Sequence, residues 1–260
     1  MYSAFLRPAR RDGEIAYHVD CTAYGRTYAT RTVRATQGAH DDTSCIYVGI
    51  LSFQRCDLPP GNHLKYSIPM PHIGDSIRPE SIPRARAQQR AMMAISARGD
   101  GTSPPLDGGD GDTAFDWRPL EGPPPPPPAD EDERAQSRQQ RAFVRSAPLS
   151  SDSASAHLAA LACLSDTYAL GAALGHGANP ATLGPKIREE VAMGVSLNHN
   201  VSLHDPTARA DEWLLCERDA SWGADGRVLV HQRFWSAGTG RLVVSGMQEG
   251  LIRLKPGSSL

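Results

Sequence analysis

The feature that most constrains the fold of this chain is the stretch LAALACLSDTYALGAALG at residues 158–175, in which Asp166 is the only charged residue. A helix that is apolar nearly all round must be buried on most of its surface. Helix-favouring residues run on both sides of Asp166, so the sequence predicts one helix over about 156–175 with a carboxylate inside it. The Ser/Asp-rich turn PLSSDSAS before this stretch offers N-caps.

Strand patterns surround this helix. A short one, FVRSA, precedes it, and four follow it: VAMGVSLNHNVSLH, DEWLLCERD, GRVLVHQRFWS and GRLVVSGMQEGLIRL. The turns GADGR and AGTGR have the composition of tight hairpins, which join antiparallel strands. A single antiparallel sheet wrapped around the helix would bury it. The sequence therefore predicts an α+β fold of the hotdog type for this region.

The rest of the chain separates by composition into two further regions. Residues 1–56 have strand character, in IAYHVD, RTYATRTVRAT and CIYVGILSFQR, with no convincing helix. Residues 57–141 contain Gly-Asp runs, six consecutive prolines and a charged stretch, which cannot bury enough apolar surface to offset chain entropy. We therefore expect a long, mostly disordered linker, with one short ordered island in AFDWRPL at 114–120.

Composition excludes several classes of function. The net charge of −2 provides no basic field for nucleic acid. Five scattered cysteines without a C-x-x-C pair predict a reducing compartment and no zinc site. No apolar run reaches 18 residues and no signal peptide is recognisable, so we expect a soluble intracellular protein with no membrane partner. Phosphate-binding, dinucleotide-binding and serine-elbow motifs are also missing.

Three polar residues stand out against their surroundings. Asp166 is a candidate general base, although Ser165-Asp166 could instead be an N-cap where the helix breaks and restarts. Gln248 is a single amide on an otherwise apolar or small strand face and needs hydrogen-bond partners, which backbone groups could also supply. In the strictly alternating strand VSLNHNVSLH the polar face is expected to meet solvent, with Ser196, nearest the loop, as the exception.

The chain resembles a known family at several of these motifs. HLAALACLSD, MGVSLNHNVSLHDP, RADEWLLCERDASWGADGRVLVHQRFW and GRLVVSGMQEGLIRLK resemble the C-terminal half of type II acyl-CoA thioesterases, the double-hotdog family. FLRP, GRTYATRTVRATQ and LSFQR are similar to parts of its first hotdog. The resemblance implies residues 1–72 as a partial N-terminal hotdog that lacks its helix, 73–141 as the linker and 142–256 as the C-terminal hotdog. It also implies that the chain is shortened at its N-terminus.

The same resemblance implies an activity. The family hydrolyses fatty acyl-CoA thioesters to free fatty acid and CoA without cofactor or metal, and its catalytic Asp, Ser/Thr and Gln fall on Asp166, Ser196 and Gln248. Self-association through the hotdog sheets would follow, and the C-terminal Ser-Ser-Leu weakly resembles a peroxisomal signal, with the cytoplasm as the alternative. A non-catalytic acyl-CoA-binding or assembly subunit is the alternative function. A third alternative, a hotdog hydratase acting on enoyl-CoA, would need an Asp-His pair near the helix start, and we expect that the His and Asp of this sequence do not have that arrangement.

Overall fold

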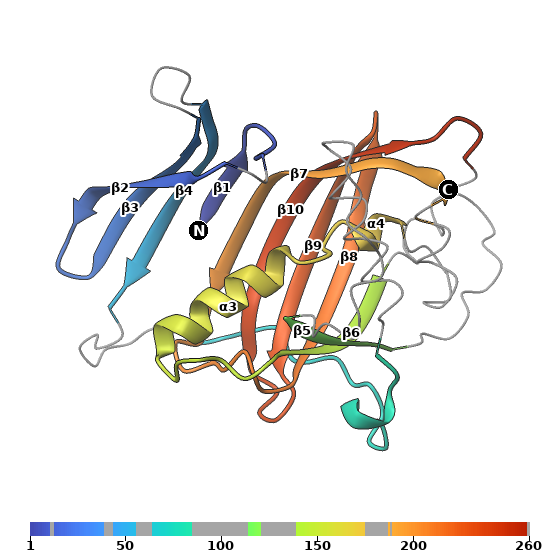
Figure 1. The fold of residues 1–260 in the computed structure, drawn as a ribbon. Helices are drawn as coiled ribbons and strands as arrows, with labels where there is room; N and C mark the ends of the chain where they lie inside the picture. The colour runs from blue at the N-terminus through green and yellow to red at the C-terminus, as the bar shows by residue number, and fades with distance from the viewer. Residues whose placement is uncertain are drawn as a thin grey trace.

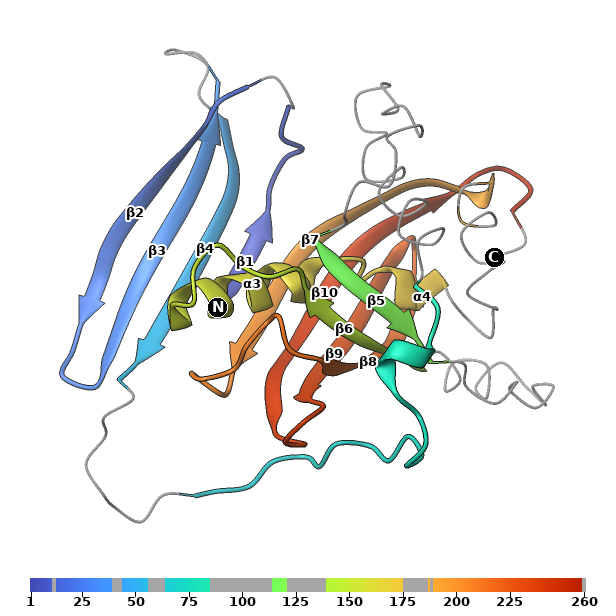
Figure 2. The same cartoon turned by 60° about the horizontal axis from the view of Figure 1, so that its bottom comes forward.

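The computed structural model describes residues 1–10, 13–38, 44–55, 64–84, 114–120, 139–174, 187 and 189–258. Within them, ten strands form one antiparallel sheet in the order β2-β3-β4-β1-β7-β10-β9-β8-β6-β5 (Figures 1 and 2). The strands are β1 (Tyr2–Phe5), β2 (Ile15–Tyr24), β3 (Tyr28–Gln37), β4 (Ser44–Gln54), β5 (Phe115–Pro119), β6 (Gln139–Ser146), β7 (Val191–Leu203), β8 (Leu214–Ala224), β9 (Arg227–Ser236) and β10 (Leu242–Leu254). The helical elements are η1 (Pro79–Ser81), α3 (Ala154–Asp166) and α4 (Gly171–Leu174).

A short strand that the sequence patterns did not indicate joins the two halves of the sheet. Strand β1 pairs with β4 on one side and with β7 on the other, antiparallel in both cases. Each half contributes an antiparallel sheet of the hotdog type, and β1 makes them continuous. Four residues are too few for a strand pattern to be recognised without the partners on either side.

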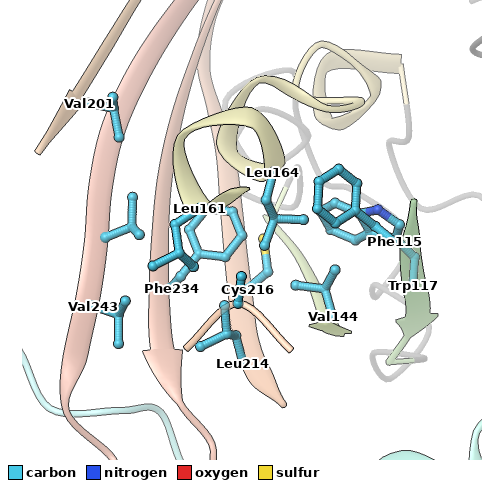
Figure 3. Close-up of a cluster of buried hydrophobic side chains, with 12 residues drawn as sticks. Phe115, Trp117, Val144, Leu161, Leu164, Val201, Leu214, Cys216, Phe234 and Val243 are labelled. Carbon is cyan, nitrogen blue, oxygen red and sulfur yellow. The ribbon is translucent and has the colours of Figure 1, made fainter. Parts of the chain in front are cut away.

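Helix α3 is the element around which the C-terminal half is built. It lies across β7 to β10 in Figure 1, and α4 continues over β8 and β9. The Ser153 side chain accepts a hydrogen bond from the Ala156 N–H and so caps the first turn, as the Ser/Asp-rich turn predicted. Leu161 and Leu164, both fully buried, point into the main core beside Val144, Phe234 and their neighbours (Figure 3).

The expectation of one helix over 156–175 with Asp166 inside it is wrong. Helix α3 ends at Asp166, and the chain restarts as the short helix α4 at Gly171. Tyr168 has φ +57°, a left-handed conformation that interrupts a right-handed helix. Residues 154–174 have the apolar composition of a membrane span, but half of that stretch is buried inside the molecule, where a core helix also satisfies the pattern. Asp166 therefore stands at a helix end rather than within a helix.

The N-terminal half is a sheet of the same kind without a described helix against it. The structure describes no helix among the residues placed up to Arg55. Strand β2 is exposed along nearly its whole length. Figure 2 shows β2, β3 and β4 extending beyond the end of α3.

Parts of the expected organisation lie outside the described residues. The linker expected over 73–141 is described only at 73–84, 114–120 and 139–141. Within it, AFDWRPL contains β5, which pairs with β6, and β6 starts at Gln139 rather than at Phe143. The division into a partial hotdog, a linker and a complete hotdog remains a proposal.

Candidate active site

The three residues singled out in the sequence come together at the end of α3. Gln248 Nε2 donates to Asp166 Oδ1 at 2.6 Å and to Ser196 Oγ at 2.7 Å. They come from three elements, with Asp166 at the end of α3, Ser196 in β7 and Gln248 in β10. Gln248 is 1% exposed, and the other two are partly buried. The carboxylate, the hydroxyl and the amide thus form one connected polar group at the edge of the core.

The orientation of the Gln248 amide follows from its partners. An ionised carboxylate only accepts hydrogen bonds, so the NH₂ of the amide must face Asp166. Both amide hydrogens are then used, one on Asp166 and one on Ser196. Oε1 of Gln248 is buried and has no partner among the described residues. The site therefore retains one unpaired buried acceptor, and the Ser196 hydroxyl hydrogen remains available to donate.

A β-bulge in β7 places Ser196 on the inner face. Gln248 pairs with His199, whereas Gly250 pairs with Ser196, so one more residue lies between the pairs on β7 than on β10. Because directly opposed residues share a face, His199 and Ser196 both lie on the Gln248 face. Strict alternation predicts opposite faces for these two residues and is therefore wrong here. The bulged segment of β7 itself contains no glycine between Ser196 and His199, which is why the pattern did not predict it.

Gly250 gives the turn after α3 room to approach the sheet. A Cβ at this position would meet the side chain of Leu170, whose methyl carbons lie against the glycine backbone. Leu170 is part of a second small core with Ile187 and Ile252. The Gly in the Q-E-G motif thus has a packing reason: it lets the segment carrying Asp166 dock next to Gln248 and Ser196.

A histidine beside the site is held neutral. Ser165 Oγ donates to Ala162 O at 2.8 Å and therefore accepts from His199 Nε2 at 3.0 Å. His199 is 2% exposed, and burial lowers its pKa, with Asp166 acting in the opposite direction. His199 was not among the candidate residues expected from the sequence. Its contact with the residue before Asp166 makes it part of the support of the site.

Comparisons with known proteins identify the family of this chain. Residues 86–252 match the family model described as the acyl-CoA thioesterase C-terminal domain, which is more than half of the chain. The chain belongs to the type II acyl-CoA thioesterase family. Acyl-coenzyme A thioesterase 8 of Mus musculus is 28% identical over 257 residues, and that of Homo sapiens is 27% identical over 263 residues. Each alignment covers 98% of this chain and 73% of the relative.

Solved structures of type II thioesterases share the fold. Acyl-CoA thioesterase II TesB2 from Mycobacterium marinum superposes with a TM-score of 0.67 at 24% identity, covering 98% of this chain and 80% of that one. A tesB protein of Mycobacterium avium subs paratuberculosis gives a TM-score of 0.60 at 20% identity, covering 97% of this chain and 77% of that one. The predicted double hotdog is confirmed. As a member of this family the protein is a thioesterase, an enzyme class that hydrolyses acyl-CoA thioesters.

One cluster elsewhere in this thioesterase has the composition of a metal site. Asp152, His157 and Asp211 bring one ligand atom each within 4.8 Å of one another near the start of α3. Arg209 already bridges the two carboxylates, donating to Asp152 at 2.8 Å and to Asp211 at 2.9 Å. The Ala210 N–H donates to His157 Nδ1 at 3.3 Å, so the neutral ring carries its hydrogen on Nε2 and has no lone pair left for a metal. The cluster is accounted for as an ion-pair network.

Proposed function

We propose that this thioesterase hydrolyses fatty acyl-CoA to free fatty acid and CoA, with Asp166, Ser196 and Gln248 as its catalytic residues. The observation that carries the proposal is the double hydrogen bond of Gln248 Nε2 to Asp166 and Ser196. Three residue types suited to activating water meet at one point although they lie 52 and 82 positions apart in the chain. The related acyl-coenzyme A thioesterases support the substrate class.

The hydrogen bonds support a proposed task for each residue. Asp166 Oδ1 is held by Gln248, and Oδ2 has no donor among the described residues, which leaves it to accept a proton from a water molecule. That water attacks the thioester carbonyl carbon, the C–S bond breaks, and the CoA thiolate leaves and is protonated. The Ser196 hydroxyl and the unpaired Gln248 Oε1 are a donor and an acceptor that can orient the water.

Thiol release measured with fatty acyl-CoA of several chain lengths tests the proposal. In Asp166→Asn the base is lost while the side-chain volume is kept, so we expect kcat to fall by roughly 10²- to 10⁴-fold. Asp20→Asn is the matched control, because Asp20 is 62% exposed on β2, far from the site in the sheet order. A wild-type protein that releases no thiol but binds acyl-CoA would instead support the non-catalytic binding subunit. An unchanged rate in Asp166→Asn would remove Asp166 from the mechanism.

Assembly and location are two further proposals. Self-association through the hotdog sheets is tested by light scattering of the purified chain over a range of concentrations.

The peroxisomal location rests on Ser258-Ser259-Leu260, of which residues 259–260 lie outside the described residues. A fluorescent fusion that exposes this tripeptide, compared with one lacking Leu260, distinguishes peroxisomes from cytoplasm.

A further inference from the structure

A buried arginine–glutamine pair lies against the segment that carries Asp166. Arg218 in β8 and Gln232 in β9 are directly opposed in the sheet and are 5% and 2% exposed. Arg218 Nε donates to Gln232 Oε1 at 3.2 Å, so the two side chains act together. Sequence analysis did not single out either residue, because each looks like an ordinary polar residue of an alternating strand.

The pair bonds to the carbonyls of the residues before and after Asp166. Gln232 Nε2 donates to the carbonyl of Ser165 at 2.7 Å, and Arg218 Nη2 donates to the carbonyl of Thr167 at 2.9 Å. The last carbonyls of a helix have no partner within the helix, and α3 ends at Asp166. A cation at a helix C-terminus is also favoured by the helix dipole. The sheet thus fixes the backbone immediately before and after the proposed base.

The Arg218 charge is unusual in its surroundings. Its guanidinium lies 4.8 Å from the centre of the Trp117 ring and 5.9 Å from that of Phe234, and it forms no ion pair within 4 Å among the described residues. Burial lowers the pKa of Arg218, while Cys216 and Asp166 act to raise it. Arginine nevertheless stays protonated in proteins, and a buried cation without a partner destabilises the fold by several kcal/mol in order of magnitude. A role of Arg218 in the active site would explain why a buried position carries this charged side chain.

Three titratable groups interact electrostatically with Asp166. Arg218 faces it from β8, His199 from β7, and Cys163 from its own helix. Burial lowers the pKa of His199 and raises that of Cys163, so both are neutral near pH 7. Gln248 in β10 and Gln232 in β9 carry no charge.

We infer that Arg218 and Gln232 are positioning residues of the thioesterase site, which hold the backbone around Asp166 so that its carboxylate faces Gln248 and Ser196. The inference rests on the proposed role of Asp166. The pair bonds to the carbonyls of the residues before and after the base and does not touch the reacting atoms. It acts on the rate of the chemical step rather than on the binding of substrate.

Steady-state kinetics of thiol release in three variants test this inference. Arg218→Met removes the donors while keeping an unbranched apolar stem, and we expect kcat to fall at least about tenfold, with KM within about twofold. Gln232→Glu removes the donor to the Ser165 carbonyl and should lower kcat in the same way, again with little change in KM. Arg218→Lys keeps an N–H donor for the Thr167 carbonyl, so kcat should recover part of the loss seen in Arg218→Met.

The control is Arg233→Met, on the neighbouring position of β9. Arg233 faces the opposite side of the sheet, where it pairs with Glu217 at 3.5 Å, and this change should leave kcat and KM unaltered. If Arg218→Met lowers only the melting temperature, with kcat as in the wild type, the pair is merely structural and the inference fails. If Arg218→Met does not fold, Gln232→Glu and Arg218→Lys decide in the same way. A fully active Asp166→Asn would instead overturn the proposed function itself, so the two failures are distinguishable.

Discussion

The two halves of this molecule share one hydrogen-bonded sheet but differ in what covers it. In the C-terminal half, α3 and α4 pack on β7 to β10, and Leu161, Leu214 and Phe234 are at most 1% exposed. In the N-terminal half, Tyr17 and Val19 of β2 are 68% and 60% exposed although every strand there is paired. Pairing of strands therefore satisfies the backbone, but only a packed second layer removes apolar side chains from water.

The difference explains where the proposed chemistry lies. The Gln248 amide, His199 and the Arg218–Gln232 pair are all buried under α3, where hydrogen bonds are stronger than in water. The polar side chains of β2 and β3, such as His18 and Thr36, also bond to each other, but in an exposed position. The hydrogen bonds that hold the carboxylate in a fixed position are therefore found in the half of the sheet that α3 covers.

The largest expected effect on stability comes from creating a cavity in the core under α3. Leu161→Ala should lower the free energy of unfolding by about 2–5 kcal/mol, because Leu161 is fully buried in the main cluster. Leu6→Ala makes the same chemical change in the N-terminal half at a residue that is 53% exposed, and should cost less than about 0.5 kcal/mol. Urea denaturation of both variants measures the difference. Equal losses would mean that the two halves are equally packed in solution.

A smaller effect is expected when a methyl group is added to a strand glycine in each half. In Gly250→Ala the new methyl group meets the packed Leu170 side chain, and overpacking of this kind costs about 1–3 kcal/mol. We also expect a lower kcat, since the displaced segment carries Asp166. In Gly49→Ala the methyl group meets the ring end of Tyr47, which is only partly buried and can move aside. Thermal melts and thiol-release rates compare the two variants, and a Gly250→Ala protein with wild-type stability and rate would show that Leu170 has room to move.

The smallest expected effect is a pH dependence confined to the covered half. Burial lowers the pKa of His199 below its usual value of 6.5, so below about pH 6.5 the unfolded chain binds a proton that the folded protein resists. Stability is therefore full above this pH and decreases as the pH falls. His199→Gln, which keeps a donor for Ser165, should flatten this slope by up to about 1.4 kcal/mol per pH unit. Unfolding free energies of the wild type and of His199→Gln between pH 7 and 5 test this, and equal slopes would contradict it.

Much of the site could be predicted from the sequence, for identifiable reasons. Gln248 was recognisable because an amide on an apolar strand face must find partners, and Asp166 because it is the single charge in an apolar stretch. The bulge beside Ser196 was not predictable from local pattern, and the end of α3 at Asp166 was indicated only as the alternative in which the helix breaks and restarts at Ser165-Asp166. Both depend on contacts made across the sheet, the first on the pairing of β7 with β10 and the second on the docking of the Tyr168 segment.

The amino-acid sequence by itself determined the elements and their chemistry: an apolar core helix capped at Ser153, strands with inward and outward faces, and a carboxylate, a hydroxyl and an amide at the motif positions of a thioesterase. Only the tertiary structure decided that β1 joins the halves, that a bulge turns Ser196 inward, and that Arg218 and Gln232 hold the backbone around Asp166. Periodicity along a strand reports which face a side chain takes within that strand. The distance between two side chains far apart in the chain depends instead on register, which is set by the partner strand.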